Sequence, residues 1–350
     1  MTTANDVNVG QYLSRLFAES HRRWACRGMT PEQVFGWQLG ARAALVRLLG
    51  LPCIEERCSG HSFVVRLRSP EAADGFTRQQ GEAHTEPGVS IRFWFFRPEG
   101  DGPFPVALLP HGHEHFGLNT YAGISTSAEH ARRIREEDRD VALQAVRRGM
   151  VAIAPVTRGF FPAAVPDRLK RHGGQHCRSQ ALHCFLAGRT AIGERVWDMM
   201  RLLDWVLGLA DTDSERVLVM GNSGGGMVTL YTAACDERVT MAVPSCSFCT
   251  IAGCDGDIHH CDCNAVPGLF QFGEMWDIAG LIAPRRLLAV NGRQDTLFPL
   301  SEVDRAVHGV ERIYRAAGCP SHFSHCYGEG GHRFYSDLMW PAIGAVFGFG

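Results

Sequence analysis

Apolar and polar positions follow two different periods in the first hundred residues. In the first 50 or so residues the apolar side chains recur at helical spacing, as they do from Tyr12 to Phe17, which predicts helices. From Ser62 to Phe96 the period shifts towards two, with Gly and Pro between the runs, and this pattern predicts antiparallel edge strands. We therefore expect an N-terminal helical extension over residues 1–60, packed on a main domain over residues 61–350.

Beyond this region, short continuous apolar runs alternate with helical patterns. Such runs are typical of strands buried on both faces of a sheet, and strands that alternate with helices imply βαβ crossovers. The runs expected to form strands lie at residues 104–110, 150–155, 216–220, 239–244, 286–292 and 322–327. The helices expected between them lie at residues 128–148, 193–207, 227–234 and 301–317. The sequence thus predicts a mostly parallel central sheet flanked by helices, with a loop excursion over residues 161–183.

One expected strand leads into Gly221-Asn222-Ser223-Gly224-Gly225, which contains the pattern G-x-S-x-G. Glycines on both sides of Ser223 allow a turn too tight for side chains. Such a turn between a strand and a helix pushes the serine hydroxyl out above the sheet edge as a nucleophile elbow. The apolar run before the motif and the helical pattern after it distinguish it from an ordinary Gly-rich loop, so Ser223 is the predicted nucleophile.

A serine nucleophile needs a histidine base, and the histidine needs an acid to orient it. After a nucleophile elbow the chain order is serine, acid, histidine. Asp295 follows the expected strand at residues 286–292, and His332 lies in a Gly-Gly-His segment after the last expected strand. We therefore predict a catalytic triad of Ser223, Asp295 and His332.

Other acids and histidines stay open at this point. Asp295 could instead be a turn or helix-capping residue. The reserve acids, all after the preceding strand, are Asp255, Asp257 and Asp262. The competing histidines lie inside an expected helix or strand and are His308, His322 and His325. His332 is preferred because it alone follows a strand end.

A tetrahedral intermediate also needs N–H donors for its oxyanion, one from the residue after the nucleophile and one from the loop after an early central strand. Gly224 is the first predicted donor. The second is His113, through its backbone N–H, with Glu114 as the fallback. The alternative is that His111, His113 and His115 are metal ligands, but spacing of two residues is weak support for a metal, and we expect no metal and no cofactor.

Five of the 13 cysteines fall between Cys246 and Cys263, in an insertion of about residues 246–276. A Cys-x-x-Cys pair with Cys254 and His259-His260-Cys261-Asp262-Cys263 nearby has the residue types of a zinc site, but its spacings match no standard finger. A zinc site, a disulfide and reduced thiols lining a compact cap therefore remain open, and the position of the insertion favours the cap. Residues considered as pocket lining or as structural residues are Arg158, Glu274 and Trp276.

Composition changes this picture little. The chain of 350 residues has 45% hydrophobic residues, 21% charged residues and a formal net charge of -2, a balance that favours neither nucleic acid nor an anionic membrane as partner. No apolar run approaches the ~20 residues needed to span a bilayer, and the N-terminus lacks a basic region followed by an apolar one. We therefore expect a cytoplasmic enzyme with a small-molecule substrate, and homo-oligomerisation stays open.

The chain from about Val89 onward resembles the α/β-hydrolase superfamily, within it the dienelactone-hydrolase-like and acetyl-xylan-esterase-like branch. The segments that carry the resemblance are Leu109-Pro110-His111-Gly112, Gly221-Asn222-Ser223-Gly224-Gly225, Ala283-Pro284-Arg285-Arg286-Leu287-Leu288, Asn291-Gly292-Arg293-Gln294-Asp295 and Gly331-His332-Arg333-Phe334. Dienelactone hydrolases proper use a cysteine nucleophile, whereas the elbow here holds a serine, which favours ester cleavage. Secreted xylan esterases carry signal peptides, and the N-terminus of this chain shows no such pattern. An extracellular polymer is therefore a doubtful substrate.

These observations predict a serine hydrolase that cleaves a carboxylic ester, such as an acetyl or other short acyl ester, through an acyl-enzyme. The same residues would also suit peptide cleavage, C–C bond hydrolysis or acyl transfer to another acceptor. A binding protein that keeps the fold without catalysis is the remaining alternative, since a fold alone does not decide function.

Overall fold

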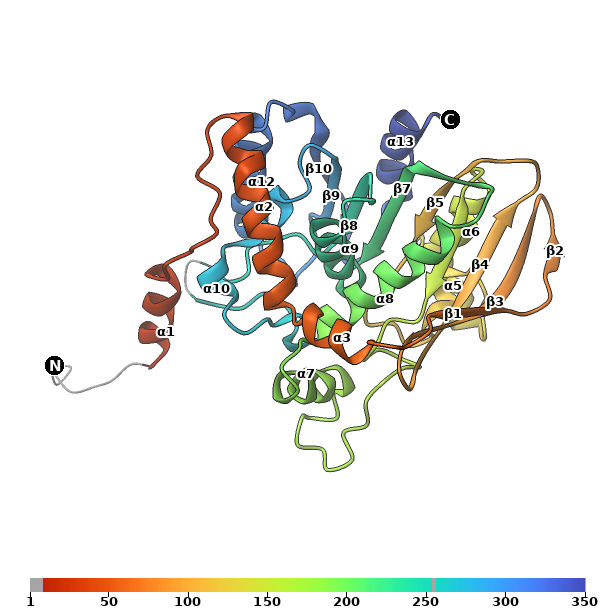
Figure 1. The fold of residues 1–350 in the computed structure, drawn as a ribbon, viewed down its shortest axis with the longest axis horizontal. Helices are drawn as coiled ribbons and strands as arrows, with labels where there is room; N and C mark the ends of the chain where they lie inside the picture. The colour runs from red at the N-terminus through yellow and green to blue at the C-terminus, as the bar shows by residue number, and fades with distance from the viewer. Residues whose placement is uncertain (1–8, 254–255, 350) are drawn as a thin grey trace, which may run out of the picture.

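The computed structural model describes residues 9–253 and 256–349, and these residues form one large twisted sheet covered by helices (Figure 1). Within them the sheet has ten strands in the order β1-β3-β4-β6-β5-β7-β8-β9-β10, with β2 paired to β3. The strands are β1 Val64–Leu67, β2 Glu71–Ala73, β3 Phe76–Glu86, β4 Val89–Pro98, β5 Phe104–Leu108, β6 Val151–Pro155, β7 Thr212–Asn222, β8 Met241–Ser245, β9 Arg286–Gly292 and β10 Phe323–Gly328. The helices are α1 Val9–Ala18, α2 Pro31–Leu48, α3 Leu51–Arg57, α4 Leu118–Tyr121, α5 Ala128–Glu136, α6 Val141–Val146, α7 His176–Leu186, α8 Ala191–Val206, α9 Gly224–Cys235, α10 Leu269–Phe272, α11 Met275–Gly280, α12 Leu300–Ala316 and α13 Ser336–Phe347, with 3-10 turns at Asp262–Asn264 and Pro320–His322.

The strands from β6 to β10 in this order are all parallel, and β1 to β4 form an antiparallel edge. Successive side chains of β5 point to opposite faces. Val106 and Leu108 join the core under α2, α8, α9, α11 and α12, whereas Ala107 joins the core under α6 and α13. Because both faces are covered, the central strands need apolar side chains at every position, which explains their continuous apolar runs. The predicted parallel sheet and edge strands are confirmed.

Helices α1 and α2 form where the sequence predicts N-terminal helices, and residues 1–8 lie outside the described part. Val34, Ala41 and Leu45 of α2 are fully buried in the main core. The Gln38 side chain donates hydrogen bonds to the carbonyl oxygens of Gly280 at 2.8 Å and Ala283 at 2.7 Å. The extension is thus built into the core of the main domain, and the boundary at residue 60 stays a prediction.

Two local expectations are wrong. The helix expected at residues 128–148 is divided into α5 and α6, because the polar residues between them leave the helical conformation. Asp138 has φ 53°, and the Arg139 side chain donates a hydrogen bond to the Glu114 carboxylate at 3.3 Å. The stretch at residues 161–183 is not all loop, since α7 begins at His176. Cys177, Ala181 and Cys184 form its buried face, which the surrounding His and Arg residues hide in the sequence.

Three further elements had no clear signal of their own. Strand β3 lies between the two apolar runs that predict edge strands, and its own sequence is polar on both faces. Helix α3 is short, and α13 is apolar but follows a Gly-rich segment. The insertion after β8 holds a 3-10 turn, α10 and α11; its role as a cap stays a prediction. No helix within the described ranges combines the length and apolar character needed to cross a membrane.

Candidate active site

The turn between β7 and α9 has the geometry of a nucleophile elbow. Ser223 has φ 57° and ψ -123°, a conformation that L residues rarely adopt and that marks a strained strand-to-helix turn. A Cβ on Gly225 would lie 2.1 Å from the carbonyl oxygen of Pro110, and a Cβ on Gly221 would lie 2.5 Å from the backbone of Gly225. Only glycine fits at both positions, so these glycines let the strand turn and expose Ser223.

Asp295 and His332 lie beyond the carboxyl ends of β9 and β10, at the same sheet edge as Ser223. Nδ1 of His332 lies 2.7 Å from Oδ2 of Asp295, whose side chain is almost fully buried. The other carboxylate oxygen accepts the N–H of Leu297 at 3.0 Å. The carboxylate is therefore fixed by its own loop and holds the imidazole in one orientation, while His332 and Ser223 border the same cavity.

The loop after β5 lies directly against the elbow. A Cβ on Gly112 would lie 2.9 Å from the backbone nitrogen of Gly224 and 2.7 Å from the carbonyl oxygen of Asn222. His113 follows at once and borders the cavity. Gly224 is the first residue of α9, whose first N–H groups have no partner within the helix and favour negative charge. The two predicted oxyanion donors thus come from neighbouring backbone segments.

The cavity at this edge has a volume of about 900 Å³. Its apolar walls come from the aromatic rings of Phe160, Phe161 and Phe298 together with Met227 and Leu297. Arg133, Arg139, His259 and His260 add polar groups at its border. Pockets of this size and mixed character suit small organic ligands. The aromatic residues of this wall carry no motif and were not singled out in the sequence.

Comparisons with known proteins agree with this fold, although no family model matches the chain. A Bacillus subtilis (strain 168) protein named "Putative hydrolase YtaP" is 25% identical over 254 residues, which cover 71% of this chain and 80% of that protein. The crystal structure of a "putative acetyl xylan esterase" from Bacteroides fragilis NCTC 9343 matches with a TM-score of 0.71 and 18% identity, over 98% of this chain and 86% of that one. "Methylesterase BT1017" matches with a TM-score of 0.71 and 20% identity, over 97% of this chain and 68% of that one.

The chain has the α/β-hydrolase fold. The predicted fold class and resemblance are confirmed, and the names of the neighbours agree with the prediction of a carboxylic-ester hydrolase. In open α/β sheets the site lies at the carboxyl ends of the parallel strands, and in this chain Ser223, Asp295 and His332 each follow the carboxyl end of such a strand.

The reserve acids Asp257 and Asp262 and the competing histidines do not border this cavity, whereas Glu114, the fallback oxyanion donor, does. Asp262 pairs with Arg178, and Asp255 and Cys254 lie outside the described residues. The competing histidines lie in α12, the last 3-10 turn and β10 and do not border the cavity; they are His308, His322 and His325. Glu114, the fallback donor, has its carboxylate held by Arg133 and Arg139 at 3.3 Å each.

Three residues considered as pocket lining are structural. Arg158 is buried and paired with Asp198 at 2.6 Å and Glu86 at 2.9 Å. Glu274 caps the first turn of α11, and Trp276 packs against the backbone of α12. None of the three is among the described residues that line the cavity.

The three histidines of the loop after β5 do not converge on one point. The His111 ring is fully buried, and its Nε2 accepts the N–H of Thr157 at 3.2 Å. Burial lowers the pKa of His111 to about 4, so this ring is neutral near pH 7. His113 instead points its ring at cysteines: Nε2 lies 3.2 Å from Sγ of Cys177, 3.6 Å from Cys261 and 3.8 Å from Cys263.

The Cys-x-x-Cys pair singled out in the sequence lies elsewhere. Burial raises the pKa of both Cys246 and Cys249 to about 12, so each is a neutral buried thiol. At the His113 cluster, by contrast, hydrogen bonds from Cys177 and Cys261 lower the pKa of Cys263 well below its usual value. Cys177 had no signal in the sequence because it lies in a stretch expected to be loop.

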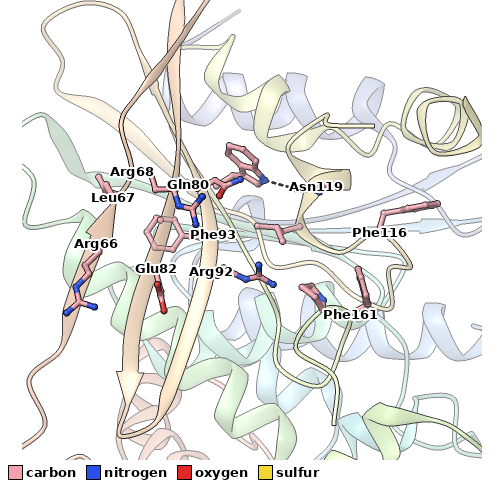
Figure 2. Close-up of a pocket in the computed structure, with 14 residues that line it drawn as sticks. Arg66, Leu67, Arg68, Gln80, Glu82, Arg92, Phe93, Phe116, Asn119 and Phe161 are labelled. Carbon is pink, nitrogen blue, oxygen red and sulfur yellow. Dashed lines mark hydrogen bonds between the residues drawn. The ribbon is translucent and has the colours of Figure 1, made fainter. Parts of the chain in front are cut away.

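A second cavity, of about 340 Å³, lies over β1, β3 and β4 beside the segment that carries Phe116 and Asn119 (Figure 2). Arg66, Arg68 and Arg92 border it, and Trp94 donates a hydrogen bond to Asn119 at 2.8 Å. Its lining contains no serine, cysteine or histidine. This smaller cavity therefore lacks the nucleophile and base that border the larger one.

Proposed function

We propose that this chain is a serine hydrolase that cleaves a carboxylic ester through a triad of Ser223, His332 and Asp295. The observation that carries the proposal is the 2.7 Å contact between His332 and Asp295 at the cavity that Ser223 borders. A hydrogen-bonded carboxylate and imidazole beside an elbow serine have the arrangement that acyl transfer requires. The site needs no metal or cofactor for this chemistry.

In the proposed mechanism Ser223 attacks the ester carbonyl while His332 takes the hydroxyl proton. The N–H groups of Gly224 and His113 bind the oxyanion of the tetrahedral intermediate. The intermediate collapses when His332 gives the proton to the leaving alkoxide, which leaves an acyl-enzyme on Ser223. Water, deprotonated by the same histidine, then releases the acid. Asp295 stabilises the charged imidazolium and keeps its Nε2 turned to the cavity.

We further propose a short acyl or methyl ester carried on a carbohydrate as the substrate class. The names of the structural neighbours, an acetyl xylan esterase and a methylesterase, support this class. The cavity supports it as well, because the aromatic rings of Phe161 and Phe298 could pack against the apolar faces of sugars while polar groups stand at the border.

The test is an activity screen with a nucleophile variant. Purified wild type is assayed against 4-nitrophenyl acetate, acetylated xylo-oligosaccharides, a methyl uronate, an anilide and a β-diketone. We expect turnover of the esters, labelling of Ser223 by a fluorophosphonate, and a loss of at least about 10⁴-fold in kcat for Ser223→Ala.

Ser324→Ala is the matched control, since Ser324 is exposed at the opposite end of β10. It should keep wild-type activity and labelling. Ester turnover that survives in Ser223→Ala would overturn the mechanism, and turnover of the anilide or diketone without that of the esters would overturn the reaction class.

A further inference from the structure

Four soft or imidazole donors converge on one point at the wall of the catalytic cavity. The donor atoms of His113, Cys177, Cys261 and Cys263 all lie within 4.8 Å of one another. They come from three separate segments: the loop after β5, the first turn of α7, and the insertion after β8. We propose that these four residues bind one structural zinc ion.

The spacing of the donors fits a tetrahedral zinc site. Bond lengths of ~2.3 Å to sulfur and ~2.0 Å to nitrogen at tetrahedral angles place two sulfurs about 3.8 Å apart, and a nitrogen and a sulfur about 3.5 Å apart. The sulfurs of Cys177 and Cys261 are 3.9 Å apart, and Nε2 of His113 lies 3.2 to 3.8 Å from the three sulfurs. Three thiolates and one imidazole are a ligand set of structural zinc, which leaves no open position for catalysis.

The charge around the cluster supports a bound metal. Arg195 is fully buried, and its Nη1 lies 3.4 Å from Sγ of Cys263. Its other hydrogen bonds go to neutral oxygens of Arg158, Gln180 and Asn264 and to the Cys263 carbonyl, and it takes part in none of the ion pairs within the described ranges. A buried guanidinium requires a negative partner. Zn²⁺ bound by three thiolates and a neutral imidazole has a net charge of one negative unit. This charge would be the partner of the Arg195 guanidinium.

A disulfide explains the cluster less well. A disulfide bond is ~2.05 Å long and joins two sulfurs, whereas here three sulfurs and one nitrogen surround a common point. A disulfide between Cys177 and Cys261 would not involve Cys263 or His113. It would also leave the Arg195 guanidinium without a negatively charged partner. The expectation of no metal in this chain followed from the two-residue spacing of His111, His113 and His115 and from the lack of a standard finger spacing within residues 246–263. Neither spacing could show that His113 and Cys177 join Cys261 and Cys263 in one set of donors.

Such an ion would hold the wall of the catalytic cavity together. The ring of His113 would bind the zinc ion, while its backbone N–H would bind the oxyanion. The ion would therefore fix the loop after β5 against the elbow. The ion would also tie α7 and the insertion to that loop. It acts as a positioning element and not as a Lewis acid, because its four positions are filled by the chain.

The experiment measures metal in the full-length chain, produced without a histidine tag in zinc-sufficient medium and purified with a reductant. We expect about one zinc ion per chain by mass spectrometry of the metal, as four-ligand structural sites give. Replacement by Co²⁺ should produce the visible bands of tetrahedral cobalt and the near-ultraviolet bands of thiolate ligation. These readouts do not depend on esterase activity, so failure of the proposed function would leave them unchanged.

Variants locate the ion. Cys263→Ser and Cys177→Ser should lose at least about 5-fold in zinc content, since each removes a ligand. Cys249→Ser and Cys184→Ser are the controls and should keep it; Cys249 belongs to the Cys-x-x-Cys pair, and Cys184 lies on α7 outside the cluster. If a ligand variant does not fold, the cobalt spectrum of the wild type decides.

Three outcomes would overturn the proposal: wild-type protein without stoichiometric zinc after zinc is added under reducing conditions, zinc that persists in Cys263→Ser, or a Cys177–Cys261 disulfide in peptide mapping. Stoichiometric iron or copper in place of zinc would overturn the identity of the ion.

Discussion

The imidazole of His332 is held by Asp295 through a 2.7 Å contact between Nδ1 and Oδ2, and Asp295 is itself held by the N–H of Leu297. An asparagine at position 295 can place its N–H₂ towards Nδ1, which forces the proton onto Nε2 and removes the base. We expect Asp295→Asn to lower kcat by about 10³ to 10⁴-fold with little change in KM, measured on the best ester of the screen.

Asp304→Asn is the control for this variant, because Asp304 accepts a 2.7 Å hydrogen bond from Tyr327 at an exposed position. It should keep full activity. A loss in Asp295→Asn that is no greater than in the control would remove Asp295 from the triad.

The backbone contact at the elbow gives a second prediction. A Cβ at Gly225 would lie 2.1 Å from the carbonyl oxygen of Pro110, so Gly225→Ala must push the elbow away from the loop after β5. We expect a loss of about 3 kcal/mol in the free energy of unfolding and a loss of activity. Gly36→Ala is the control, since nothing lies within 4 Å of a Cβ there and alanine favours the helix. Urea unfolding of both variants measures the difference.

The buried pair of Arg158 and Asp198 should contribute to stability and not to chemistry. Asp198 is buried, with carboxylate oxygens 2.6 and 2.7 Å from the guanidinium. Asp198→Asn removes a negative charge from beside the buried Arg158 guanidinium. We expect it to lower the free energy of unfolding by about 3 kcal/mol. Glu329→Gln breaks the exposed pair with Arg293 and should cost less than about 1 kcal/mol. Equal losses in thermal or urea unfolding would contradict this reading.

Glu274 predicts a pH dependence of stability. Burial raises the pKa of its carboxyl to about 7 from the ordinary value of 4.5, although backbone N–H groups of Met275 and Ile251 oppose the shift. A raised carboxyl pKa means that its contribution is fully present below pH 4.5 and is lost as the pH rises through 7. Wild type should therefore lose up to about 3 kcal/mol relative to Glu274→Gln between pH 5 and pH 8, measured by urea unfolding at both pH values. A loss in the opposite direction would contradict the shift.

The sequence predicts the parallel core well because each central strand is buried on both faces and so carries a continuous apolar run. It predicts Ser223 and the order of Asp295 and His332 because the elbow and the strand ends constrain residue type at fixed places. The polar strand β3 has no such run, since only part of it is buried. The break between α5 and α6 depends on a tertiary contact with Glu114, which no local pattern records.

The cluster around His113 shows a different limit. Its ring meets Cys177 across 64 residues and Cys261 across 148 residues, so no spacing rule for adjacent ligands applies. The sequence drew attention instead to Cys246 and Cys249, which are close in the chain but buried in separate surroundings. Proximity in the chain was misleading here because the fold, and not a local motif, brings the donors together.

The burial of α2 has a consequence for how the chain is made. This helix packs against α9, α10 and α12, and in Figure 1 it runs beside α12. Just before it in the chain, Cys26 accepts a hydrogen bond from Arg312 at 3.0 Å. During synthesis from the N-terminus, α2 therefore waits until nearly the whole chain has left the ribosome before its apolar face is covered. Closing so long a loop is slow, and nascent chains of this protein should depend on chaperones that shield that helix.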